Sequence, residues 1–64
     1  MAKIRTNTRR KLGAIAIYLM EGSYSFSFDA KNLTIILSDD VAAESIKTFL
    51  QRVGIEESNF TIFE

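Results

Sequence analysis

YSFSFDAKNLTIIL, residues 24–37, alternates large apolar side chains with polar ones on both sides of a short polar turn. Rings at every second position, with serine between them, have the period of a strand that is buried on one face only. Asp29 can bond its own backbone at the start of the turn, and Asn32 tolerates the left-handed conformation that such loops require. Because the run Leu33–Leu37 resumes the alternation, the stretch predicts a β-hairpin.

The segment that follows the hairpin carries the signals of an amphipathic helix. Ser38, Asp39 and Asp40 can cap its first N–H groups, where the helix dipole also favours carboxylates. Gly54 can end the helix in the left-handed conformation. The apolar stripe consists of Ala42, Ile46, Phe49, Leu50 and Val53. We expect this helix to cover the aromatic face of the hairpin, with Phe49 at the centre of the stripe.

The stretch Leu12–Met20 fits both a helix and a strand. As a helix it has one apolar stripe with Gly22 as its cap. As a strand it places Ile15, Ile17 and Leu19 on one face. A helix would begin with the cations of residues 9–11 and end with Glu21, which opposes its dipole at both ends. The β-branched isoleucines also suit a strand. We therefore predict a strand and keep the helix as the alternative.

The chain reads as one small domain over residues 1–64. A final short strand is predicted at Phe60–Phe63, where Phe60 and Ile62 share a face. The expected fold is α+β, a small antiparallel sheet with one covering helix in the order β-β-β-α-β. The alternative order is α-β-β-α-β, with two helices on a three-stranded sheet.

Length and composition limit the possible classes. Hydrophobic residues make up 47% of the 64 residues, which argues against disorder, and there is no cysteine for disulfides or thiolate metal sites. No apolar run approaches the roughly 20 residues that cross a bilayer. Leu12–Met20 superficially resembles a signal peptide but lacks a convincing cleavage site. We expect a cytoplasmic protein, or the product of an intracellular parasite genome, without a membrane partner.

Most catalytic chemistry is absent from the sequence. Without histidine and cysteine there is no nucleophilic triad and no common transition-metal ligand. The pair Asp39-Asp40 is explained by helix capping and Glu56-Glu57 by a solvated loop, and the three glycines are too dispersed to cradle a phosphate. We expect no enzymatic activity, no cofactor and no metal.

Charge is distributed unevenly along a chain whose net charge is zero. Residues 1–22 carry five basic groups and one acidic group, whereas residues 23–64 carry three basic and seven acidic groups. We expect residues 1–11 to form a basic, flexible arm, or a strand that lies against phosphates. The candidate nucleic-acid-binding residues are Lys3, Arg5, Arg9, Arg10 and Lys11. The rings of Tyr24, Phe26 and Phe28 could stack bases, but a domain this small needs them for its core.

Two functions remain after these exclusions. The first is a small interaction protein, an adaptor or inhibitor, that binds a partner protein as a homodimer. We expect the dimer because eleven large apolar groups of the predicted sheet would have only one helix to cover them, leaving the sheet face or the Leu12–Met20 edge for a second copy. In the two-helix alternative no large patch remains. The second function is a nucleic-acid-binding accessory protein that uses the basic arm.

Overall fold

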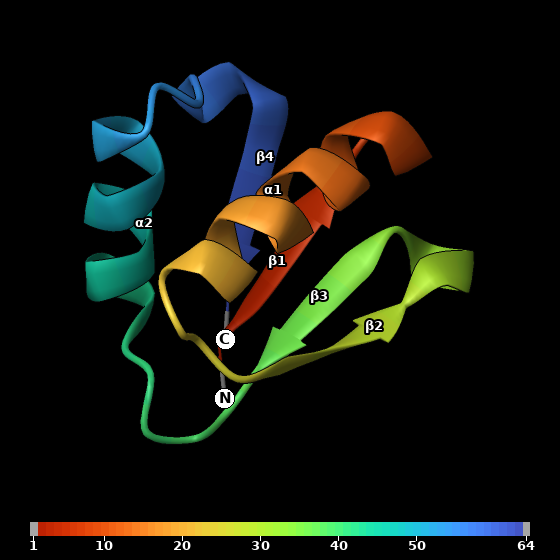
Figure 1. Cartoon of the computed structure of the whole chain (residues 1–64). Helices are drawn as coiled ribbons and strands as arrows, with labels where there is room; N and C mark the ends of the chain where they lie inside the picture. Colours follow the sequence, from red (N-terminus) through yellow and green to blue (C-terminus); the bar gives the residue numbers. More distant parts are fainter. Residues whose placement is uncertain (1, 64) are drawn as a thin grey trace.

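The part of the chain that the structure describes, residues 2–63, contains four short strands, two α-helices and two 3-10 helices. Short connections join the elements of this computed structural model (Figure 1). In chain order they are β1 (Lys3–Thr6), α1 (Arg9–Glu21), β2 (Phe26–Asp29), the 3-10 helix η1 (Ala30–Asn32), β3 (Thr34–Leu37), α2 (Ala43–Arg52), the 3-10 helix η2 (Glu57–Asn59) and β4 (Phe60–Phe63). The α+β class that the sequence predicts is confirmed.

The strands form one antiparallel sheet in the order β2-β3-β1-β4. The first strand of the chain therefore lies in the interior of the sheet, where it pairs with β3 on one side and β4 on the other. β2 and β4 form the two edges. The connection order β-α-β-β-α-β is that of the ferredoxin-like, or split β-α-β, motif.

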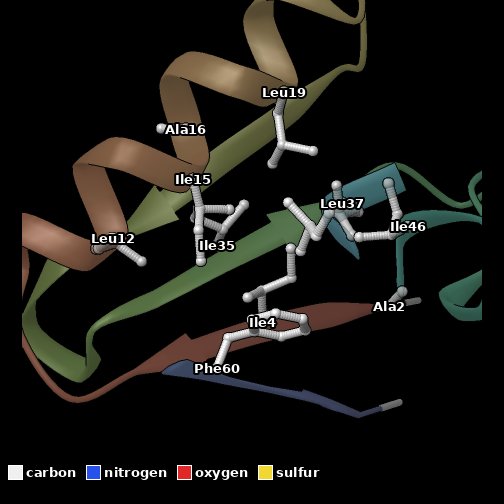
Figure 2. Packing of buried hydrophobic residues seen from close by; sticks show 11 residues of the cluster. Ala2, Ile4, Leu12, Ile15, Ala16, Leu19, Ile35, Leu37, Ile46 and Phe60 are labelled. Carbon is white, nitrogen blue, oxygen red and sulfur yellow. The ribbon is translucent and has the colours of Figure 1, made fainter. Parts of the chain in front are cut away.

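Both helices contribute to one core on the same face of the sheet (Figures 1 and 2). α1 packs on β1 and β3, and α2 packs on β4. Strand alternation directs Ile4 and Ile35 towards the helices, while the helical stripes supply their partners. The buried apolar residues are Ala2, Ile4, Leu12, Ile15, Ala16, Leu19, Ile35, Leu37, Ile46, Leu50 and Phe60.

The strand predicted at Leu12–Met20 is wrong, because these residues lie within α1. Helical spacing buries a stripe of four residues, Leu12, Ile15, Ala16 and Leu19. Full burial of one large aliphatic side chain stabilises by about 1.5–3 kcal/mol, whereas an exposed charge at the wrong end of a helix costs about 0.3–1 kcal/mol. Thr8 also caps the helix, since its hydroxyl accepts a hydrogen bond from the Lys11 N–H at 3.2 Å. Burial and capping thus outweigh the unfavourable dipole.

The flexible arm predicted over residues 1–11 is not found in the described part of this segment, where the alternative, a strand, is present. Met1 lies outside the described residues; Lys3–Thr6 form β1, and Arg9 already begins α1. The Leu37 N–H donates to the Ala2 carbonyl at 2.9 Å, and the Thr6 N–H donates to the Leu33 carbonyl at 3.0 Å. Alternation along this segment buries Ile4 completely, and that burial anchors the strand. The order β-β-β-α-β is corrected accordingly.

The predicted hairpin is present, and β2 and β3 are its strands. Its turn differs from the prediction, because Leu33, and not Asn32, takes the left-handed conformation, with φ 52°. Asn32 instead donates its side-chain N–H to the Asp29 carboxylate at 2.8 Å. Phe28, expected in the core, is 54% exposed because it lies on an edge strand beyond the helices.

The C-terminal ends of both helices agree with the sequence, since Gly22 is the C-cap of α1 and Gly54 follows α2, whereas the start of α2 differs. α2 begins after Ala42 without a side-chain cap, so the capping predicted for Ser38, Asp39 and Asp40 is wrong. Ser38 instead accepts the Val41 N–H through its carbonyl at 3.1 Å, in a turn that precedes the helix. Gly54 has φ 94°, as the left-handed termination requires.

Both helices end in the same hydrogen-bond motif. After α2, Gly54 N–H donates to Gln51 and Ile55 N–H to Leu50, at 3.1 and 2.9 Å. After α1, the N–H groups of the two residues that follow Gly22 donate to the carbonyls of Met20 and Leu19 at 3.1 and 3.0 Å. These are the paired bonds of the Schellman motif. The left-handed position is glycine in one case and Ser23, with φ 63°, in the other.

Candidate functional site

The five predicted nucleic-acid-binding residues are divided between two layers of the molecule. Lys3 and Arg5 alternate with buried residues on β1, so their side chains leave the sheet on the face opposite the helices. Arg9, Arg10 and Lys11 form the first turn of α1 and belong to the helical layer. The structure therefore brings together two of the five residues on the open face of the sheet and separates them from the other three.

The open face is built by cross-strand neighbours of these two cations. Opposite residues in an antiparallel ladder share a face, so the register places Ile36 and Phe63 on the two sides of Lys3. Arg5 lies in the same way between Thr34 and Thr61. Ser27 and Asp29 continue the two rows onto β2. We call this set of eight residues the open face; it is polar except for one isoleucine and one phenylalanine.

An aromatic ring lies beside the central arginine on the open face. The Arg5 guanidinium carbon is 5.6 Å from the centroid of the Phe63 ring, within the range of a cation–π contact. Phe63 was not singled out by the sequence reasoning. Its position was implied all the same, because a strand that directs Phe60 and Ile62 inwards must direct Phe63 outwards.

A shallow hollow of about 180 Å³ lies between the cations and the end of the hairpin. Its polar rim is held by local hydrogen bonds, since Asn32 donates to Asp29 at 2.8 Å and the Thr34 hydroxyl donates to the Asn32 carbonyl at 2.8 Å. The lining residues are Lys3, Arg5, Asp29, Asn32, Thr34, Ile36 and Phe63. The face thus offers cations, hydroxyl groups and one ring to a ligand. It is not the apolar surface on which the sequence-based expectation of a dimer rested.

A different surface of the molecule combines free backbone groups with exposed apolar side chains. The Ser38 N–H donates to the Ser25 carbonyl at 3.2 Å, so the alternation of an antiparallel ladder directs the polar groups of Ser25, Ser27 and Asp29 towards β3. The backbone N–H and C=O groups of Phe26 and Phe28 are consequently directed away from the sheet. We call this outer side of β2 the β2 edge.

Large apolar side chains are exposed on β2 and on α1. Phe28 contacts Phe26 edge to face, with ring centroids 5.5 Å apart, and remains 54% exposed. Met20, in the last turn of α1 before the chain enters β2, is 67% exposed, and Ile17, one turn earlier, is 60% exposed. These three are the exposed large hydrophobic residues of the described chain. β2 carries no proline or lysine, the residues that often protect an edge strand.

The hairpin rings do not form the base-stacking platform that was considered as the alternative to a core role. Phe26 and Phe28 lie opposite Leu37 and Ile35, which are buried, so both rings stand on the helix-bearing side of the sheet. Tyr24 lies before β2 and contacts Phe49 edge to face at 5.1 Å. Tyr24 and Phe26 pack against the core, as the preferred reading of these rings expects.

Charged groups elsewhere in the described chain make few specific contacts. Lys47 and Glu57 form an ion pair at 2.8 Å that joins α2 to η2, and the hydrogen bond and charge of Glu57 raise the pKa of Lys47. Residues 2–63 contain no group of three or more acidic, histidine or cysteine side chains that could hold a metal ion. They also contain no helix with the length and apolar character needed to span a membrane.

The chain as a whole was compared with models of protein families, with curated proteins and with solved structures, and none of the three comparisons finds a match.

Proposed function

We propose that the chain is a small interaction protein without enzymatic activity, and that it binds protein by adding a strand to the β2 edge. A single observation carries the proposal: the backbone groups of Phe26 and Phe28 are directed out of the sheet on a strand whose Phe28 ring is more than half exposed. Strand addition uses such main-chain groups for affinity and alternate side chains for specificity. The partner that fits this edge best is a second copy of the chain.

In a two-fold antiparallel arrangement, the β2 edge of one copy pairs with the β2 edge of the other. Centred on Ser27, it places Phe26 of one copy opposite Phe28 of the other, and each such pair can exchange both of its N–H···O=C bonds. Because opposite residues share a face, the rings of both copies would stand in one row on the helix-bearing side. Aromatic pairs of this kind stabilise a ladder by about 0.2–1 kcal/mol each relative to alanine.

The charges at the ends of α1 are complementary in the same arrangement. Arg9 and Arg10 lie at the start of the helix and Glu21 at its end. A two-fold axis through β2 makes the two copies of α1 antiparallel, so the basic start of one helix faces the acidic end of the other. Because α1 packs on β1 and β3, the two helices would lie several strand spacings apart, so these charges act at long range and favour the encounter of the two copies.

The proposed dimer differs from the one expected from sequence alone. That expectation required an uncovered apolar sheet face or an edge strand at Leu12–Met20, and two covering helices remove both premises. The β2 edge is an independent argument. Since β2 has only four residues, the interface is small and belongs to the weak, transient class, so association is expected at high micromolar concentrations and above.

Analytical ultracentrifugation over a hundredfold range of concentration tests the proposal. We expect the parent chain to pass from monomer to dimer, and Phe28→Lys to remain monomeric with an unchanged circular dichroism spectrum, since more than half of Phe28 is already in solvent. Thr61→Lys is the matched control, because this exposed residue lies on the opposite edge strand. A parent chain that stays monomeric at the highest concentration rejects the proposal, and dimerisation abolished only by Thr61→Lys assigns the interface to β4 instead.

A further inference from the structure

We propose that the open face of the sheet binds single-stranded nucleic acid, with Lys3 and Arg5 contacting phosphates and Phe63 stacking on a base. This proposal is independent of self-association through the β2 edge, because the open face is complete in one copy of the chain. It also replaces the basic arm expected from the sequence with a surface built by all four strands of the sheet.

The two cations stand where a ligand on the open face must contact them. Both come from β1, an interior strand, and they are two residues apart, so their side chains leave the same face of the sheet about 7 Å from each other along the strand. Arg5 is exposed and Lys3 is half-buried. Two cations at this spacing can contact successive phosphates of an extended strand, which supplies the charge complementarity.

The ring of Phe63 adds a stacking surface next to the phosphate contacts. Phe63 is only partly buried, and the Arg5 guanidinium lies 5.6 Å from its centroid. A base that stacks on an exposed ring beside an arginine gains both aromatic and cation–π contacts. Hydroxyl groups on the same face, those of Ser27 and Thr61, are exposed and can donate to phosphate or sugar oxygens.

The shape of the surface favours a single strand over a duplex. The major groove of a duplex admits a helix or a two-stranded ribbon, whereas the open face is a four-stranded sheet. A single strand can lie across such a sheet with its bases unpaired and free to stack on side chains. Either DNA or RNA would satisfy phosphate contacts and stacking, so the shared chemistry is that of a single-stranded polynucleotide.

One acidic side chain lies at the margin of the site and opposes the ligand. Asp29 shares the hollow with Lys3 and Arg5, and its carboxylate accepts a hydrogen bond from Asn32 at 2.8 Å. A carboxylate at this position repels a phosphate that approaches Arg5. Removing its charge with Asp29→Asn should therefore strengthen binding, a gain that loss of folding would not produce.

Fluorescence anisotropy with labelled oligothymidylate and oligouridylate, and with a duplex of the same length, measures the binding. If the protein neutralises two phosphates of a single strand, raising the salt from 50 to 200 mM should weaken binding by about sevenfold. The logarithm of the affinity falls with the logarithm of the salt concentration with a slope of about −0.7 per phosphate. The double variant Lys3→Gln/Arg5→Gln should abolish this dependence. Arg9→Gln/Arg10→Gln removes the same number of charges from the start of α1 and is the matched control, for which affinity should change by less than about twofold.

Phe63→Leu tests the ring, because leucine keeps an apolar side chain on β4 but has no aromatic face. Its affinity for single strands should fall by at least about fivefold, the lower end of what base stacking contributes. The assignment is overturned if the parent chain binds no single strand at 50 mM salt, if the duplex binds as tightly as the single strands, or if the helix variant loses the salt dependence that the sheet variant keeps.

Discussion

The C-terminal motifs of α1 and α2 place a serine and a glycine in the same left-handed backbone conformation. Ser23 and Gly54 occupy the same left-handed position of the same motif, with φ 63° and 94°. Both are exposed, and a Cβ at Gly54 would have no neighbour within 4 Å, so side-chain packing does not enter the comparison. The left-handed conformation costs a residue with a side chain about 1–2 kcal/mol.

We predict that Ser23→Gly stabilises the protein and that Gly54→Ser destabilises it. Glycine avoids this cost but loses more chain entropy on folding, which cancels about 0.5–1 kcal/mol of the benefit. The expected gain in stability for Ser23→Gly is therefore about 0.5–1 kcal/mol. In a domain of this size that gain raises the melting temperature by about 2–8 °C. Thermal unfolding followed by circular dichroism at a fixed protein concentration measures both variants. If Ser23→Gly melts at or below the parent temperature, the left-handed backbone at residue 23 does not carry the assigned cost.

Two further substitutions test the packing around α2. Leu50→Ala should lower the free energy of unfolding by about 2–5 kcal/mol, because Leu50 is fully buried. Phe49→Ala should lower it by less, because that ring is only partly buried. Chemical denaturation measures both, and the reverse order would mean that the Phe49 ring faces the core. Gly22→Ala should destabilise the protein by about 1–3 kcal/mol, since the added methyl would lie 2.9 Å from the Phe49 ring. A double variant that also carries Phe49→Leu should recover part of this loss of stability. If it recovers none, the strain does not arise from the Phe49 ring.

The hairpin and α2 could be predicted because their signals are local. Alternation in residues 24–37 and one apolar stripe with Gly54 at its end each favour a single element type. The start of α2 could not be predicted correctly from the sequence. Ser38, Asp39 and Asp40 are residue types that favour helix N-caps, and no local signal shows that the helix begins after them, at Ala43.

Helix α1 and strand β1 depend on each other, and the sequence reasoning treated them separately. Once Leu12–Met20 is read as a strand, Ile4 has no core to enter, and the N-terminal segment is left as an arm. In the structure, α1 covers β1, and Ile4 is buried beneath it (Figure 2). The charges of Arg9, Arg10 and Glu21 at the ends of α1 are exposed and contribute little to stability, whereas the burial that decides the fold is a tertiary property.

The error at α1 also affected the candidate site. Lys3 and Arg5 were identified from their charge, but a flexible arm gives no reason to separate them from Arg9 and Arg10. Only a strand in the interior of the sheet places the first pair on an open face and the second pair in the helical layer. Phe63 joins the site through its pairing with Lys3, a contact between opposite ends of the chain that no local pattern contains.

The two proposed surfaces are compatible in one assembly. Pairing along the β2 edge would continue the sheet, with the open faces of both copies on the same side. The two β1 strands would then be separated by five strand spacings, about 24 Å, and a single nucleic-acid strand of sufficient length could contact the cations of both. Linking two sites in this way raises the overall affinity through effective concentration, without any new contact. Weak self-association and weak binding on each face would thus reinforce each other, because nucleic acid that bridges two faces also holds the β2 edges together.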